Sequence, residues 1–146
     1  MGRRLDRWRA LRGRERRRLV LCAIGLALVH ACLAVFGYAR TRRAIERWTR
    51  HPAPRKATAE EFADAQAMAR MATIAGRHGA VEATCLRRSL LLHGWLRRRG
   101  LHPVLQLGVA EQTGPFQAHA WVELDGEPLL PSDAGYRPFS RTPASG

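Results

Sequence analysis

The feature that most constrains the fold is a run of 21 residues, 19–39, without a formally charged side chain. Arg-rich segments flank it at 3–18 and 40–50. Such a run suits a membrane-spanning helix, a cleaved signal sequence, or a hydrophobic helix packed against the rest of the protein. We expect the packed helix. Residues 1–50 should form two helices joined through 19–39, with their Arg-rich ends at the surface, docked on the protein core or on a partner.

The net charge of +13 belongs to the N-terminal part of the chain. Residues 1–58 hold sixteen Arg and Lys against three acidic residues, whereas 59–146 hold nine of each. The arginines flank an apolar run and do not alternate with stacking aromatic residues, so we expect no nucleic-acid binding. Two prolines in the segment 51–56 indicate a linker. We therefore divide the chain into N-terminal helices, 1–57, and a core, 58–146.

The core sequence predicts helices first and strands afterwards. Thr58 followed by two glutamates is typical of a helix start, and a second helix should run from an N-cap at Thr84 to Gly100. Alternating patterns predict strands at 104–109 and 116–124, and Asp-Gly at 125–126 predicts a hairpin turn into a return strand. The expected class is α+β, with a small antiparallel sheet.

Cys85 is the candidate nucleophile. Cys22 and Cys32 lie inside the apolar run, where a thiol behaves as a small hydrophobic group. Cys85 instead falls in the predicted first turn of a helix, where free N–H groups and the helix dipole favour the thiolate. The alternative is a buried structural cysteine.

His119 is the candidate general base that a nucleophilic cysteine needs. Strand alternation places it on the face of Trp121, opposite Ala118, Ala120 and Val122. The imidazole can meet the Cys85 sulfur if the sheet packs on that helix through the His119 face. A third group must then hold the imidazole, and we favour Asp133 on the returning chain over Asp125 in the turn.

The remaining histidines have weaker claims. His93 lies eight residues after Cys85, about 12 Å along a helix, which is too far for a base. No histidine has metal-ligand spacing to another His or Cys, and no nucleotide-binding glycine motif is present. We expect neither a metal nor a cofactor.

These residues together resemble the transglutaminase-like family of lasso-peptide biosynthesis, the B proteins that remove the leader from a lasso precursor. The resemblance covers about residues 60–135. It rests on CLRRSLLL at 85–92, LRRRG at 96–100, LGV at 107–109, AHAWVE at 118–123 and DG at 125–126. The order of Arg-rich start, apolar helix and second basic helix is also similar to that family.

The resemblance implies a papain-like, transglutaminase-like cysteine protease core. Its Cys-His-Asp triad would be Cys85, His119 and Asp133, with Asp125 as the alternative third member. It also implies a cytoplasmic leader peptidase of the stand-alone layout. Such a protein works with the precursor leader, a separate winged-helix leader-binding protein and an ATP-dependent lasso cyclase.

Two other functions remain open at this stage. A transglutaminase-like acyl transferase would use the same acid-base residues with an amine in place of water. A non-catalytic, membrane-associated scaffold would depend on the basic N-terminal region and on residues 19–39.

Overall fold

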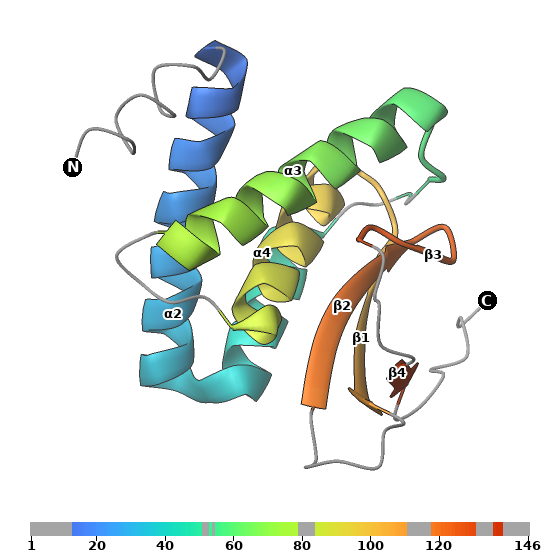
Figure 1. Cartoon of the computed structure of the whole chain (residues 1–146). Coiled ribbons are helices and arrows are strands. Elements are labelled where there is room, and N and C mark those ends of the chain that lie inside the picture. The colour runs from blue at the N-terminus through green and yellow to red at the C-terminus, as the bar shows by residue number, and fades with distance from the viewer. Residues whose placement is uncertain are drawn as a thin grey trace.

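The computed structural model describes residues 13–50, 53, 55–78, 84–110, 118–130 and 136–138. Three helices precede a small antiparallel sheet, which confirms the expected α+β class (Figure 1). The helices are α2 (Gly13–Trp48), α3 (Ala59–His78) and α4 (Cys85–Arg98). The strands are β1 (Pro103–Ala110), β2 (Ala118–Leu124), β3 (Glu127–Pro128) and β4 (Tyr136–Pro138).

Helix α2 contains the whole apolar run and bends sharply at Gly37. That glycine has φ 71° and ψ 174°, a left-handed conformation that other residues rarely adopt. The arm 13–36 therefore ends at the bend, and the arm 38–48 turns back toward α4 (Figure 1). Over residues 13–48 two helical arms are present, as expected, but the break between them lies near the end of the apolar run. Residues 1–12, which the same expectation included, lie outside the described residues.

Helix α3 begins as the sequence predicts. The Thr58 hydroxyl accepts a hydrogen bond from the Glu61 N–H at 3.2 Å, and the Glu61 carboxylate accepts one from the Thr58 N–H at 3.0 Å. This reciprocal pair is a capping box. Arg55 also binds Glu61 through two hydrogen bonds, and it lowers the pKa of that carboxyl to about 2.

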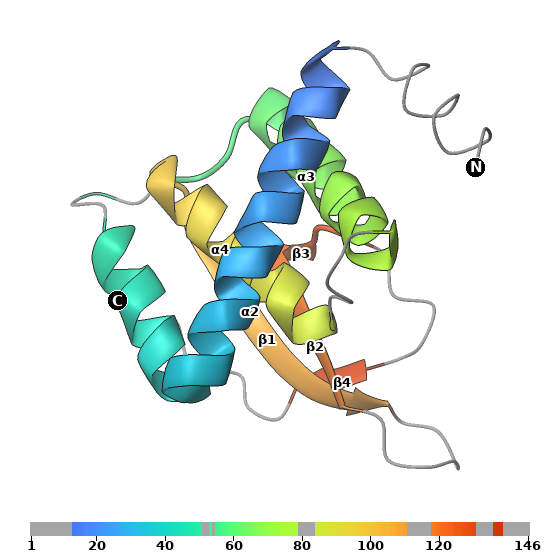
Figure 2. The same ribbon diagram turned by 90° about the vertical axis from the view of Figure 1, so that its left-hand side faces the viewer.

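The three helices share one apolar core with the sheet. Cys22, Leu26 and Val29 of α2 are buried in the same cluster as the alanine-rich face of α3 and the leucines of α4. Gly25 lies against Leu91 of α4, where a Cβ would overlap the leucine side chain, so glycine permits this close approach. Arg18 of α2 forms an ion pair with Asp64 of α3. Helix α2 packs against α3 and α4 (Figure 2), and one of its faces is part of the folded core.

The sheet has the strand order β3-β2-β1-β4. Strands β1 and β2 are antiparallel, with Leu105 opposite Val122 and Gly108 opposite His119. The predicted hairpin turn is confirmed, because Asp125 and Gly126 have φ values of 54° and 88°, the left-handed pair that a tight hairpin requires.

Candidate active site

Cys85 is the first residue of α4 and is half-buried. Thr84 occupies the N-cap position with extended backbone angles, φ −63° and ψ 162°, as the sequence predicts. Its side chain makes no capping hydrogen bond, so the capping contact expected of it is absent. The N–H groups of the first helical turn are therefore not occupied by the Thr84 side chain, and an anion at this helix end could accept hydrogen bonds from them.

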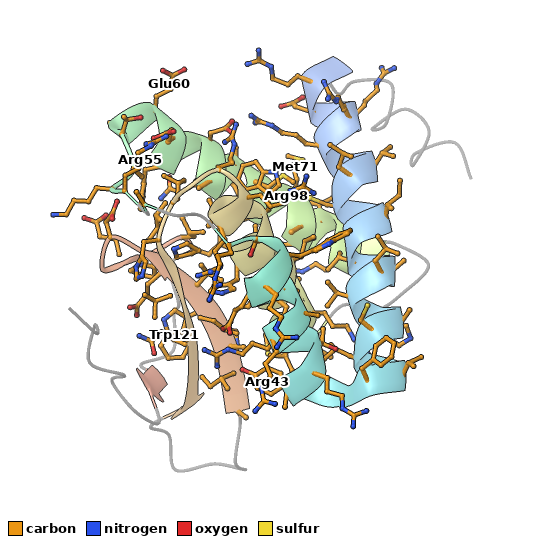
Figure 3. All side chains as sticks on the ribbon, turned by 180° about the vertical axis from the view of Figure 1, so that it is seen from behind. Arg43, Arg55, Glu60, Met71, Arg98 and Trp121 are labelled. Carbon is orange, nitrogen blue, oxygen red and sulfur yellow. The ribbon has the colours of Figure 1, made fainter. Side chains whose placement is uncertain are left out.

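His119 lies near the start of β2, on the face opposite the core. Ala120, Val122 and Leu124 are buried, whereas His119, Trp121 and Glu123 alternate with them and are half-buried. Figure 3 shows Trp121 on the side of the sheet turned away from the helices. The predicted alternation along this strand is confirmed.

The His119 ring stacks on Trp121, with 6.1 Å between ring centroids and 17° between planes. The Trp121 indole N–H in turn donates to the Glu123 carboxylate at 3.0 Å. The other oxygen of that carboxylate accepts a hydrogen bond from the Gln106 side chain of β1 at 3.1 Å. Trp121 therefore packs against the imidazole on this face, and Glu123 and Gln106 hold Trp121 in place through hydrogen bonds.

The electrostatic environment of His119 favours the neutral imidazole. Partial burial lowers its pKa, and the positive charge of Arg88 lowers it further. A neutral imidazole at neutral pH can accept a proton, which is what a general base must do. Arg88 lies one turn after Cys85 on α4, so its charge reaches His119 from the start of that helix.

Helix α4 meets β2 at the edge of the strand. The buried Ser89 hydroxyl donates a 3.0 Å hydrogen bond to the Ala120 carbonyl. The Val122 carbonyl, two residues further along, accepts one from the Leu129 N–H on the β3 side. Carbonyls two residues apart point to the same edge of a strand, and β3 pairs only with Glu123 and Leu124. Ser89 therefore binds the same edge of β2 as β3 does, just beyond the residues that pair with β3.

The structure corrects one expectation about how the sheet packs on the helix that begins with Cys85. The sheet packs on the helices through the Ala120 face, not through the His119 face. Core packing requires the small and aliphatic residues of β2 to face the helices, so the half-buried His119 face turns away. The start of α4 approaches the His119 segment around the strand edge instead.

Cys85 and His119 lie at the same end of the molecule. Cys85 precedes Ser89 by one helical turn, about 6 Å along the axis. His119 directly precedes Ala120, the partner of Ser89, about 3.3 Å along the strand. Figures 1 and 2 agree that α4 begins beside the first part of β2. Nucleophilic catalysis by a cysteine requires an imidazole within hydrogen-bond reach of the thiol, so Cys85 and His119 are the candidate pair.

Of the two candidate acids, the structure describes Asp125. Asp125 accepts a 2.8 Å hydrogen bond from the Ala57 N–H, so its carboxylate ties the linker to the hairpin turn. It follows the far end of β2, about 20 Å along the strand from His119. Asp133 lies outside the described residues.

Other titratable groups sit in the core, away from this site. Burial lowers the pKa of His93 to about 4, and neither of its ring nitrogens has a hydrogen-bond partner among the described residues. Burial raises the pKa of the Cys22 thiol to about 11, and its sulfur lies 3.7 Å from that of Met68. In the part of the chain that the structure describes, no cluster of three His, Cys, Asp or Glu residues could hold a metal ion.

Arg88, Ser89 and Glu123 are site residues that the sequence reasoning did not identify. Ser89 had a local signal, because it is a polar residue four positions after Cys85 on a buried helical face. Glu123 had a weaker signal, because the alternating pattern of β2 places it on the same face as His119 and Trp121. Nothing in the sequence indicated that Arg88 acts on His119, since that requires the tertiary contact between α4 and β2.

The comparison with known families gives one match. The model of the transglutaminase-like superfamily matches residues 27–143, which include α3, α4, all four strands and most of α2. No curated protein and no solved structure matches the chain. Members of this superfamily are typically Cys-His-Asp enzymes. Because the match covers most of the sequence, this chain belongs to the transglutaminase-like superfamily.

Proposed function

We propose that this protein is a cysteine peptidase that removes the leader from a ribosomally made lasso-peptide precursor. The observation that supports it most is the contact between α4 and β2. Through Ser89 and Ala120, the helix that begins with Cys85 meets the strand segment that contains His119. The motifs at 85–92 and 118–123, which resemble lasso-peptide B proteins, form the two sides of this contact.

In the proposed reaction, His119 takes the Cys85 proton and the thiolate attacks the carbonyl carbon that precedes the core peptide. The N–H of Cys85 donates to the oxyanion of the tetrahedral intermediate. The imidazolium then gives its proton to the leaving amine of the core peptide, and the leader remains as a thioester on Cys85. His119 next deprotonates a water molecule, which attacks the thioester and releases the leader as a carboxylic acid.

Asp133 is the proposed third member, which would hold the imidazole in the tautomer that accepts the thiol proton. Asp125 is a weaker candidate because its carboxylate binds the Ala57 N–H. The proposed protein partners are the leader-binding protein and the ATP-dependent cyclase, and the proposed location is the cytoplasm. An amine in place of water would give acyl transfer by the same groups, so the products distinguish the two reactions.

The experiment combines the protein with a candidate lasso-peptide precursor and a small leader-binding protein from the same genome, and weighs the products over time. Wild type should release leader and core, and Cys85→Ala and His119→Ala should each lose several orders of magnitude in rate. Cys32→Ala, which removes another half-buried thiol, should retain the wild-type rate. A wild-type rate in either site variant would refute the proposal, and a leader joined to an added amine would indicate acyl transfer.

A further inference from the structure

The first arm of α2 has two apolar faces, and only one of them is covered. Cys22, Leu26 and Val29 face the core. On the opposite side the structure leaves a set of large apolar side chains exposed, here called the outer face: Val20, Leu21, Ile24, Leu28 and Val35. The positions 21, 24, 28 and 35 recur at helical spacing, so they form one continuous stripe.

The exposure of this face increases toward the bend. Val20 is 43% exposed, Leu28 is 62% exposed and Val35 is 72% exposed. A soluble monomer rarely leaves so many neighbouring large apolar side chains in water. The outer face therefore points to a binding partner that is itself apolar.

Exposed arginines lie at both ends of the outer face. Arg14 and Arg17 are exposed before it, and Arg40 and Arg43 are exposed after the bend. Figure 3 shows Arg43 close to the bent end of α2. Between residues 13 and 45 the sequence has a single acidic residue, Glu15. A partner that complements this surface is apolar along the stripe and negatively charged beside it.

A second copy of the chain fits this surface poorly. Two outer faces packed together would bring the arginine-rich ends of one α2 against those of the other, in either orientation. Repulsion between these charges opposes such a dimer.

A bilayer-spanning helix also fits poorly. Within the described residues, α2 is the one helix long and apolar enough to cross a membrane. To span, however, it would have to withdraw Cys22, Leu26 and Val29 from the core and separate Arg18 from Asp64.

We propose that the outer face of α2 lies in the surface of an anionic lipid bilayer. The stripe would enter the boundary between headgroups and acyl chains, parallel to the membrane, and the flanking arginines would contact lipid phosphates. The inner face of α2 would stay in the core, so the folded domain would sit on the membrane. This proposal is independent of the peptidase proposal.

Vesicle flotation of the full chain tests this proposal. The probes are vesicles of phosphatidylcholine mixed with phosphatidylglycerol, and vesicles of phosphatidylcholine alone. The wild type should float with the anionic vesicles at least about tenfold more than with the neutral ones, and salt should weaken this binding. The double variant Leu28→Glu, Val35→Glu should lose flotation, whereas Ile74→Glu, at an exposed position on α3, should keep it. Circular dichroism checks that each variant is folded.

Four outcomes would overturn the proposal. The first is that the wild type does not float. The second is that it floats equally with both kinds of vesicle. The third is that folded Leu28→Glu, Val35→Glu floats like the wild type. The fourth is that the protein resists a carbonate wash, which would indicate a spanning helix. One combination of results would identify a second copy of this chain as the partner of the outer face. In that case neither protein floats, light scattering shows a dimer of the wild type, and the double variant is a monomer.

Discussion

The Ser89 hydroxyl and the Ala120 carbonyl join α4 to the edge of β2 through a buried 3.0 Å hydrogen bond. Cys85 lies one helical turn before the first of these residues, and His119 directly precedes the second. One contact between a helix and a strand edge therefore sets the position of both candidate catalytic groups.

Removal of this hydroxyl should destabilise the fold and slow the reaction. Ser89→Ala leaves the Ala120 carbonyl buried without its donor, which should cost about 1–3 kcal/mol. Urea unfolding measures the loss. Thr73→Ala is the matched control, because that hydroxyl donates to the Ala69 carbonyl inside α3 and its loss should cost less. Equal stability of Ser89→Ala and wild type would show that the contact does not support the site.

Arg88 should tune the basicity of His119. Its positive charge lowers the pKa of the imidazole, so Arg88→Gln should raise that pKa. NMR titration of the His119 ring protons measures the change directly. Arg98→Gln, at the far end of α4, should leave the titration where it is. A downward change, or none, in Arg88→Gln would contradict the proximity of the two groups.

Buried His93 should make the fold sensitive to mild acid. Its pKa is about 4 in the fold against 6.5 for an exposed histidine, so the unfolded chain binds a proton first as pH falls. The contribution of neutral His93 to the free energy of unfolding is therefore fully present above about pH 6.5, and it is lost as the pH falls toward 4. Between about pH 6.5 and pH 5 the loss should be about 2 kcal/mol. This interval lies above the one in which Glu61 contributes, because its pKa moves from 4.5 to about 2.

Urea unfolding at a series of pH values measures this dependence. His93→Leu should have a flatter stability profile over the same interval, whatever its absolute stability. His102→Gln should change the slope much less than His93→Leu, because His102 is exposed and acts on His93 only through its charge. An unchanged slope in His93→Leu would assign the acid sensitivity to another group.

The three cysteines should differ in their reaction with iodoacetamide. Cys22 is fully buried, and burial raises its pKa to about 11, so it should react only after unfolding. Cys85, at the start of α4, should react faster than half-buried Cys32. Peptide mass mapping over time gives the three rates. Faster labelling of Cys32 than of Cys85 in the folded protein would argue against an activated thiol at the helix end.

The local signals in the sequence predicted most of the secondary structure. Thr58 and Glu61 form the helix start that their spacing indicated, Asp125 and Gly126 form the turn, and β2 alternates as its pattern required. Each of these features depends on residues close together in the chain. The candidate pair of Cys85 and His119 came from residue type and motif in the same way.

The relations between distant segments could not be predicted in this way. A glycine inside an apolar run is compatible with an unbroken helix, so nothing local indicated a bend at Gly37. The choice between the face and the edge of β2 depends on how α4 packs in three dimensions. The hydrogen bond of Ser89 becomes visible only once that packing is known.

The most direct test of the proposed reaction is the intact mass of the protein, quenched in acid while it processes precursor. The account predicts a fraction of molecules heavier by the leader minus one water, with the thioester mapped to the peptide that contains Cys85. Cys85→Ala should form no such species and release no leader. Leader release by Cys85→Ala at the wild-type rate, with no adduct on the wild-type protein, would contradict the account.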